Sequence, residues 1–443
     1  MAAVTAGCGS RLSTEQIRAD SVVKGARTTT NGAAASAEGD SGAAAGADAS
    51  GAAPTGDAGA ATAAASTGGA STGAKAATAA PTKKAPIIIG YIGWLSGTGG
   101  ETMAPTRDVW VAWARTVNAH GGINGHPVQL LVGDHGGNES QAVAIARDFV
   151  ENKGAIALTE AAGGPAVGDW AKSKGIPVIG SILTGGDWNA NPMLFPPFGS
   201  DQASSWGSAR LMKKEGTKKL SIIYCAESND CASGSERVKQ AAEAEGIQVV
   251  SSTRYSVTAP DYTAECIQMR SAGADTVYPT GDTGSMIRMA RACARQNFHP
   301  TWVSPTMDDS VASNPDFEGA VDASNTFPWF LRSGHPLVQE YATALQTYAP
   351  SRLTRGNTFM PWSWVSAKIF EKAAQHVSDK PTTQDILEGL WAMKGETLGG
   401  LLQGPAARTF TRGQPTPETF CTYEGRLHAG KWEAPQGISP ICR

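Results

Sequence analysis

Residues 87–100 read IIIGYIGWLSGTGG, and residues 118–132 read NAHGGINGHPVQLLV. The first run, Ile87–Gly93, has the continuous apolar character of a strand that is buried on both faces, and Val128–Val132 is a second such run. A helix-like segment between them completes a β-α-β unit. In open α/β sheets, ligands bind at the carboxyl ends of parallel strands, so the loop Trp94–Gly100 is the first candidate for a site.

Composition and motifs exclude several classes of function. The chain of 443 residues carries a formal charge of −3, so no strong field favours nucleic acid or an anionic membrane surface. It has no run of about 18 apolar residues, and we therefore expect no transmembrane helix. Hydrolase and Walker-type motifs are absent, and His120, His126 and His135 are too scattered for a metal site. We expect no cofactor, no metal and no catalytic residue.

The start of the chain suggests export. Thr5-Ala6-Gly7-Cys8 resembles the end of a bacterial lipoprotein signal, in which small residues precede a cysteine that receives lipid. The alternative is an unstructured terminus with a free thiol. Residues 21–85 are dominated by Ala, Gly, Ser and Thr and contain few side chains that could form a core. We predict a disordered tether, so residues 1–85 form a lipoprotein-like start and a low-complexity linker.

The remaining cysteines point to the same compartment. Without Cys8 the chain has six, an even number, and exported chains use such sets as disulfides. Spacing favours three pairs: Cys225 with Cys231 across a short polar loop, Cys266 with Cys293 between neighbouring helices, and Cys421 with Cys442 across a C-terminal hairpin. The alternative is a set of buried thiols in a cytosolic protein.

After residue 85, strand-like and helix-like segments alternate in two series. The first has helices at 141–152 and 167–174 and strands at 155–159 and 177–182. The second has helices at 203–215, 235–245, 262–272 and 285–296 and strands at 220–224, 248–252, 276–278 and 301–304. The last part is predicted to form a strand at 324–330, helices at 337–348 and 362–377, and a hairpin at 420–432. Two such series predict an α/β fold with two doubly wound parallel-sheet lobes.

The exit of the first helix carries a resemblance to a known family. Asn118-Ala119-His120-Gly121-Gly122-Ile123-Asn124-Gly125, after a strand and Ser96-Gly97, resembles the first unit of the branched-chain amino acid type, or type I, of periplasmic binding proteins. These are solute receptors of ABC importers. Asp134, Gly175–Ile179 and Asp275–Tyr278 are similar as well, and the resemblance covers essentially everything after residue 85.

The resemblance implies an arrangement of the lobes. A three-stranded hinge would join an N-terminal lobe, 86–204 plus 328–412, to a C-terminal lobe, 205–324 plus 416–443. All three disulfides would then lie in the second lobe. In the family, the ligand lies between the lobes, and hinge closure traps it.

The resemblance also implies a set of site residues. Amino-acid-binding members hold the α-carboxylate with hydroxyls and backbone N–H groups of one lobe, and the ammonium with an acidic residue and a tyrosine of the other. Thr184 matches the family's threonine, whereas Asp282 replaces the tyrosine and Thr306 the glutamate. The expected ligand-binding residues are Trp94, Ser96, Glu160, Ala161, Ala162, Gly163, Gly164, Leu183, Thr184, Asp282, Thr306 and Met307.

Several of these residues have a second interpretation. Trp94 is a cleft wall, a lobe core residue or a surface residue. Asp282 contacts ligand or caps the helix that follows it, and capping does not exclude contact. Backbone N–H groups of Ala162–Gly164 can cradle an anion at a helix start, although Glu160, which is otherwise a salt-bridged rim residue, would oppose one.

These features predict a monomeric, extracytoplasmic receptor that captures a small organic solute, either amino-acid-like or aromatic and neutral. Its partners would be the permease of an ABC importer and, through a lipid on Cys8, the membrane. One alternative is an extracellular hydrolase that uses Glu160 and Asp282 as an acid and base pair. Another is a receptor that senses its ligand without transport.

Overall fold

The computed structural model describes residues 84–443 except 98, 162–163, 181–186 and 305. The predicted lipid-bearing Cys8 and nearly all of the predicted linker lie outside this part of the chain. Within it, no helix combines the length and apolar character that a membrane span requires.

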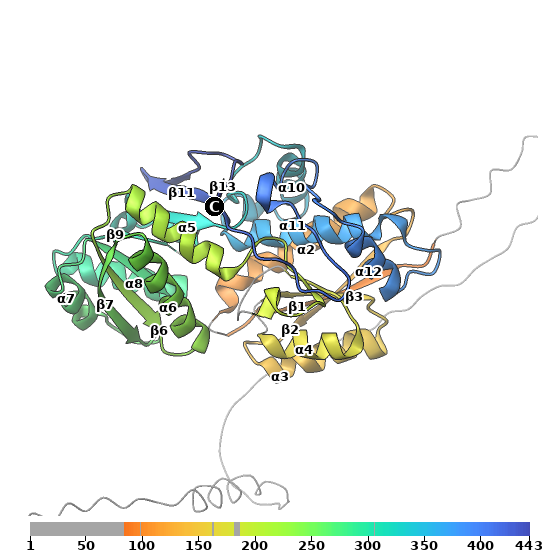
Figure 1. Ribbon diagram of the computed structural model, residues 1–443, viewed down its shortest axis with the longest axis horizontal. Coiled ribbons are helices and arrows are strands. Elements are labelled where there is room, and N and C mark those ends of the chain that lie inside the picture. The colour runs from red at the N-terminus through yellow and green to blue at the C-terminus, as the bar shows by residue number, and fades with distance from the viewer. Residues whose placement is uncertain (1–83, 98, 162–163, 181–186, 305) are drawn as a thin grey trace, which may run out of the picture. The chain divides into compact units, whose positions relative to one another are not determined.

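The first sheet has five parallel strands in the order β2-β1-β3-β4-β5 (Figure 1). They are β1 (Ile87–Gly93), β2 (Val128–Asp134), β3 (Ala157–Ala161), β4 (Val178–Ile179) and β5 (Leu194–Phe195). Ile87, Ile89 and Tyr91 on β1 have no exposed surface, as the apolar run predicts. β1 is therefore an interior strand, paired with β2 on one side and with β3 on the other.

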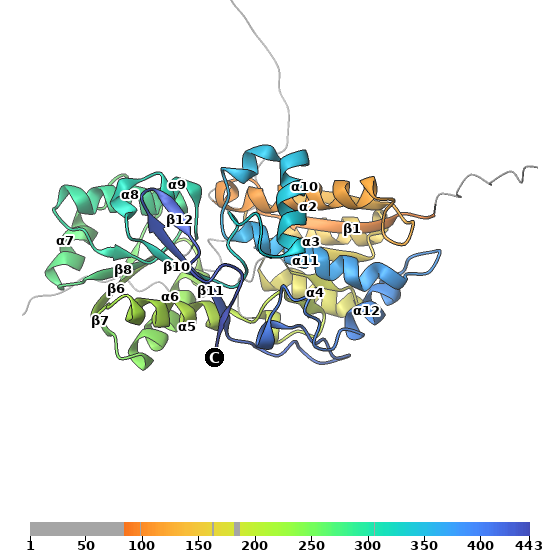
Figure 2. The same ribbon diagram turned by 90° about the horizontal axis from the view of Figure 1, so that it is seen from above.

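Helices cover both faces of this sheet (Figures 1 and 2). On one face lie α3 (Glu139–Arg147) and α4 (Pro165–Lys174), and on the other α2 (Gly100–Ala119) and α11 (Phe359–Ala373). α10 (Pro336–Tyr348) packs on α2, and α12 (Thr383–Trp391) packs on α11. The last part of the chain thus returns to complete the first lobe.

The second sheet has four parallel strands in the order β7-β6-β8-β9. They are β6 (Lys219–Cys225), β7 (Gln248–Tyr255), β8 (Thr276–Thr280) and β9 (Thr301–Trp302). Its helices are α5 (Asp201–Lys214), α6 (Asn229–Ala244), α7 (Thr263–Ser271), α8 (Thr283–Arg295) and the short α9 (Asp309–Ala312). Two doubly wound parallel sheets are thus confirmed.

A small antiparallel sheet completes the structure. It consists of β10 (Val321–Ser324), β11 (Cys421–His428), β12 (Lys431–Glu433) and β13 (Ile441–Cys442). The predicted strand at 324–330 is wrong, because β10 ends at Ser324, where its pairing with Tyr423 of β11 stops. Pro328 has no backbone N–H and could not have continued a ladder.

Buried side chains form separate cores in the two lobes. The first core draws on residues between Ile87 and Phe198 and between Phe327 and Phe410, together with Cys421 and Tyr423. The second lobe has two clusters, from residues between Ala209 and Ala323 together with Trp329, Leu427 and Trp432. The predicted lobe boundaries stay a prediction, and three residues pack with the lobe opposite to the one expected: Trp329, Cys421 and Tyr423.

The three predicted disulfide pairings are confirmed. Cys225–Cys231 joins the end of β6 to α6, Cys266–Cys293 joins α7 to α8, and Cys421–Cys442 joins β11 to β13. Their placement in the second lobe needs a correction, because Cys421 is buried with the first lobe's core and the third bridge therefore lies at the boundary. The first two lie within the second lobe.

Other elements differ from the prediction at their ends. α6 begins at Asn229, six residues before the predicted start, because Ser228 caps it by accepting a hydrogen bond from the Asp230 N–H. α12 was not predicted, although Thr382 and Asp385 form a capping box that marks its start. β4 covers only two residues of the predicted strand at 177–182.

Candidate functional site

The loop after β1 is fastened to the end of β2. Asp134 Oδ1 accepts hydrogen bonds from the backbone N–H groups of Leu95 and Gly136, both at 2.9 Å. Burial acts to raise the pKa of Asp134, but these bonds and one from the Ser96 hydroxyl hold that pKa below its usual value. Ser96 is thus placed by a carboxylate of the neighbouring strand, and its contact with a ligand stays a prediction.

Trp94 packs against its own loop. A Cβ added at Gly99 would lie 2.6 Å from the indole, and one added at Gly137 would lie 2.9 Å from it. Both positions therefore need glycine for the ring to lie so close to the backbone. Its Nε1 is buried and has no hydrogen-bond partner in the described part of the chain. The half-buried indole therefore supports the loop. Contact between its N–H and a ligand stays a prediction.

Asp282 is the N-cap of α8. Its Oδ1 accepts a hydrogen bond from the Ser285 N–H at 3.0 Å, which satisfies one of the free donors of the first turn. The next residue, Thr283, is 8% exposed, and its hydroxyl has no partner among the described residues. The capping interpretation is thus confirmed, and Asp282 and Thr283 differ in that only the Thr283 hydroxyl lacks a described partner.

Thr306 and Met307 follow β9 and have different surroundings. Thr306 is 4% exposed, and its hydroxyl lacks a partner within the described ranges. Met307 is fully buried, its N–H donates to Thr358 Oγ1 at 2.9 Å, and its sulfur lies against Gly425. Met307 is therefore a core residue in this structure, whereas Thr306 offers a free hydroxyl.

The expected anion cradle at the start of α4 is described only in part. Gly164 has φ 78° and precedes Pro165, the first residue of the helix. A Cβ added at Gly164 would lie 2.4 Å from Glu139 Oε1. A negative group therefore already stands at this helix start. Four predicted site residues lie outside the described part of the chain: Ala162, Gly163, Leu183 and Thr184. The side chains of Glu160 and Ala161 lie outside it as well.

A cavity of about 390 Å³ lies between the first turns of α2 and α8. It joins elements of both sheets, because α2 follows β1 and α8 follows β8. Asn357 Nδ2 donates to the Thr102 carbonyl oxygen at 2.8 Å and closes one side. The lining residues are Glu101, Thr102, Pro105, Thr283, Gly284, Ile287, Asp308, Asp309, Ser310, Arg352, Arg355, Gly356 and Asn357.

The charges in this cavity are of both signs. Burial raises the pKa of Asp308, and the carboxylates of Asp309 and Glu101 add to that increase. Burial also raises the pKa of Asp309, while Arg355 acts against it. Arg352 is bound to Asp108 at 2.8 Å, whereas Arg355 makes no ion pair with any described residue. Arg355 therefore interacts electrostatically with Asp309 without forming an ion pair in the described chain.

Sequence reasoning found the neighbourhood of this cavity, but none of the predicted ligand-binding residues is among its lining residues. Asp282 and Met307 each directly precede a lining residue, Thr283 and Asp308. A helix start after a glycine-rich loop was a usable signal for Thr102. Arg355 carried no local signal, because it reaches the cavity from a connection far along the chain.

A sequence model of the family described as periplasmic binding protein matches residues 86–421. The chain belongs to the periplasmic binding protein family. No curated protein matches it. A solute-binding protein of an ABC transporter from R. palustris, solved with benzoate, is 13% identical with a TM-score of 0.65, covering 81% of this chain and 98% of its own.

Two further solved structures share the fold of this periplasmic binding protein. A second R. palustris solute-binding protein, solved with 4-hydroxybenzoate, is 16% identical over 81% of this chain and 97% of its own, with a TM-score of 0.65. A leucine-binding protein from Thermotoga maritima is 13% identical over 80% of this chain and 99% of its own, with a TM-score of 0.63. The type I fold expected from the helix exit at Asn118–Gly125 is thus confirmed.

Proposed function

We propose that this periplasmic binding protein is the substrate-binding receptor of an ABC importer and captures a small carboxylate-bearing solute between α2 and α8. The cavity of about 390 Å³ between these helix starts is the observation that carries the proposal. It has the size of a small-molecule pocket and draws on both lobes, so closure of the hinge would enclose a ligand there.

Arg355 supports a carboxylate as the shared chemical feature of the ligand. A guanidinium without an ion pair in the described chain can bind a carboxylate through two parallel hydrogen bonds. Solved relatives hold benzoate and 4-hydroxybenzoate, and another is named for leucine, and all three molecules have a carboxylate. The carboxyls of Asp308 and Asp309 are suited to an additional ammonium, which favours an amino-acid-like ligand over a neutral one.

Thr283 allows a specific test by thermal unfolding. Its buried hydroxyl has no partner among the described residues, so Thr283→Val should leave the melting temperature of the free protein unchanged or raise it. If ligand uses the hydroxyl, the stabilisation by leucine, benzoate or 4-hydroxybenzoate should shrink in this variant.

The control is Thr326→Val. Thr326 is 1% exposed and its hydroxyl also lacks a described partner, but it does not line the cavity. It should therefore keep the full ligand shift. Equal ligand shifts in Thr283→Val and the unmodified protein would contradict the placement of the site.

The remaining assignments belong to the same proposal. The family binds solutes, and we propose that this chain has no enzymatic activity, because Asp282 of the suggested acid and base pair caps α8. Recovery of unchanged ligand after incubation tests this. We also propose a monomer that is held outside the cytoplasm by a lipid on Cys8 and delivers its ligand to a permease. Mass spectrometry of the N-terminal peptide tests the lipid.

A further inference from the structure

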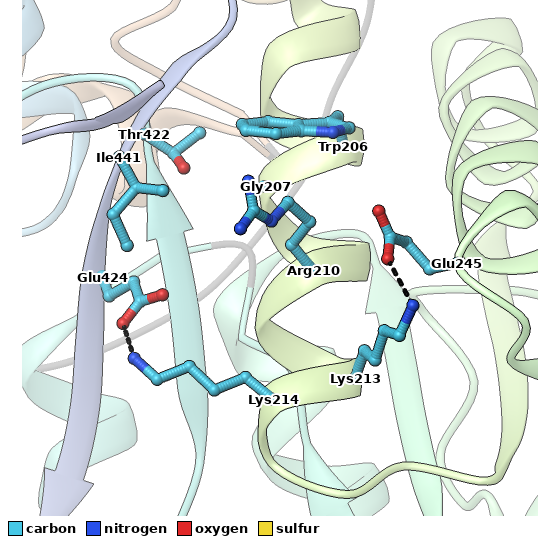
Figure 3. A pocket seen from close by; sticks show the side chains of 9 residues that line it. All are labelled: Trp206, Gly207, Arg210, Lys213, Lys214, Glu245, Thr422, Glu424 and Ile441. Carbon is cyan, nitrogen blue, oxygen red and sulfur yellow. Dashed lines mark hydrogen bonds and ion pairs between the residues drawn. The ribbon is translucent and has the colours of Figure 1, made fainter. Parts of the chain in front are cut away.

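A second cavity lies on the second lobe, where α5 faces β11 and the end of α6 (Figure 3). Its volume is about 470 Å³, and it shares no lining residue with the cavity between α2 and α8. It is lined by Trp206, Gly207, Arg210, Lys213, Lys214, Glu245, Thr422, Glu424 and Ile441. We call it the α5 groove.

Arg210 supplies an unpaired positive charge in the α5 groove. It lies four residues after Trp206 on α5, so the two side chains share one face of the helix. The guanidinium carbon is 5.0 Å from the centre of the Trp206 ring, and Figure 3 shows the guanidinium between this indole and the side chains of β11. No carboxylate of the described chain forms an ion pair with Arg210.

The two lysines of the groove are held at its edges. Lys214 Nζ lies 2.5 Å from Glu424 Oε2, and Lys213 Nζ lies 3.0 Å from Glu245 Oε2. The Glu424 side chain is only 9% exposed, so the first pair is anchored on a buried carboxylate. Three cations thus face two carboxylates, and the charge of Arg210 remains uncompensated.

The wall of the groove is closely packed where α5 meets β11. A Cβ added at Gly207 would lie 2.4 Å from Thr422 Cγ2, so α5 is in close contact with β11 at this point. The Cys421–Cys442 disulfide ties β11 to β13 beside it. A closely packed wall lowers the ordering cost of binding, which favours a specific site over a loose charged surface.

A neighbouring cavity adjoins the α5 groove at Trp206. Its volume is about 380 Å³, and it shares Trp206 and Glu245 with the α5 groove. It adds Arg237 and Arg443 to the lining, and the Arg443 guanidinium lies 5.8 Å from the Phe420 ring centre. The two cavities thus meet at Trp206 and Glu245, and the positive site is assigned to Arg210 in the α5 groove.

We propose that the α5 groove is a second binding site, separate from the inter-lobe cavity, for a small carboxylate or phosphate anion. Arg210 presents its fork to the anion while stacked on Trp206, a geometry suited to two parallel hydrogen bonds. Lys213 and Lys214 flank Arg210 at the edges of the groove, each paired with a glutamate (Figure 3). Trp206 and Thr422 form the wall behind the anion, and the site does not depend on the identity of the cleft ligand.

The test is isothermal titration of the full disulfide-bonded chain with citrate and, separately, with inorganic phosphate at low ionic strength. We expect saturable binding of at least one anion, weakened by added salt because the lysines are more than half exposed. Arg210→Ala should weaken binding about tenfold or more, and Arg210→Lys should restore only part of it. Binding of citrate alone would identify a carboxylate site, and binding of phosphate alone a phosphate site.

Arg291→Ala is the matched control. Arg291 is an exposed arginine on α8, outside both cavities that flank Trp206, and its removal changes the net charge by the same amount. It should bind the anion as the unmodified protein does. The proposal is overturned if neither anion binds saturably, or if Arg210→Ala and Arg291→Ala lose the same affinity. Thr283→Val alters the inter-lobe cavity and should keep anion binding in the α5 groove. This variant therefore distinguishes a failure of the α5 groove proposal from a failure of the proposed function.

Discussion

The Thr358 hydroxyl donates a hydrogen bond to Asp322 Oδ2 over 3.2 Å and thereby joins the start of α11 to β10. Thr358 Oγ1 also accepts the Met307 N–H at 2.9 Å. Because α11 covers the first sheet and β10 follows the second, this hydroxyl links the two lobes close to the proposed cavity. Asp322 is 3% exposed and has no basic partner within the described ion pairs.

Asp322 predicts a pH-dependent stability. Burial raises the pKa of Asp322 to about 7, above the value of about 3.9 expected in the unfolded chain. The folded state therefore binds more protons between about pH 4 and 7, and the free energy of unfolding falls as the pH rises through that range. Asp322→Asn has no carboxyl to lose a proton and should not show this decrease. The difference in free energy of unfolding, variant minus unmodified protein, should therefore grow with pH by up to about 4 kcal/mol.

Urea unfolding at several pH values measures this difference. Near pH 4 the two proteins should be nearly equal, because the carboxyl of Asp322 is protonated in the native state and can act like an amide. A constant offset between the two proteins from pH 4 to pH 8 would contradict the account of Asp322.

The disulfides should differ in their contribution to stability. Cys266–Cys293 closes a loop of sequence separation 27, and Cys225–Cys231 one of 6. The loss of loop entropy in the unfolded chain predicts about 3.5 kcal/mol for the first bridge and about 2 kcal/mol for the second. Paired Cys→Ala variants, unfolded in denaturant, give these values. Equal losses would show that loop closure is not the main effect.

Gly389 lies where the backbones of α12 and α11 are in close contact. A Cβ there would lie 1.9 Å from the Ala373 carbonyl oxygen, so Gly389→Ala must push the helices apart and should destabilise the fold by about 2–4 kcal/mol. Gly234→Ala, within α6, is the control. Its added Cβ meets nothing closer than 3.7 Å, and it should stabilise by about 0.5–1 kcal/mol. Equal effects of the two substitutions in thermal unfolding would disprove this packing.

Most of the architecture was predictable from sequence because strong local patterns agree with the tertiary structure. The apolar run at Ile87–Gly93 is a central buried strand, and the alternation after it gives two parallel sheets. The disulfides were predictable because each pair closes a short, local connection. β10 was misplaced because its pairing partner, β11, lies about a hundred residues later, and no local pattern reveals that pairing.

The candidate site was less predictable, because its side chains come from distant connections. Thr283 directly follows the predicted residue Asp282. The Asp282 carboxylate is occupied by capping α8, whereas the Thr283 hydroxyl has no described partner, and sequence alone does not reveal this difference. Met307 was predicted to line the cleft because it follows Thr306, yet its sulfur lies against Gly425 in the core. Arg355 reaches the cavity only through the return of the chain to the first lobe.

The central claim is that a ligand carboxylate binds at Arg355, and a double-mutant cycle tests it most directly. Affinities of leucine and benzoate are compared with those of leucinamide and benzamide in the unmodified protein, in Arg355→Ala and in Arg147→Ala. Arg147 is an exposed arginine of α3 outside the cavity. We expect at least one carboxylate to bind about tenfold tighter than its amide, with this preference kept in Arg147→Ala and lost in Arg355→Ala. A preference that survives in Arg355→Ala would contradict the account.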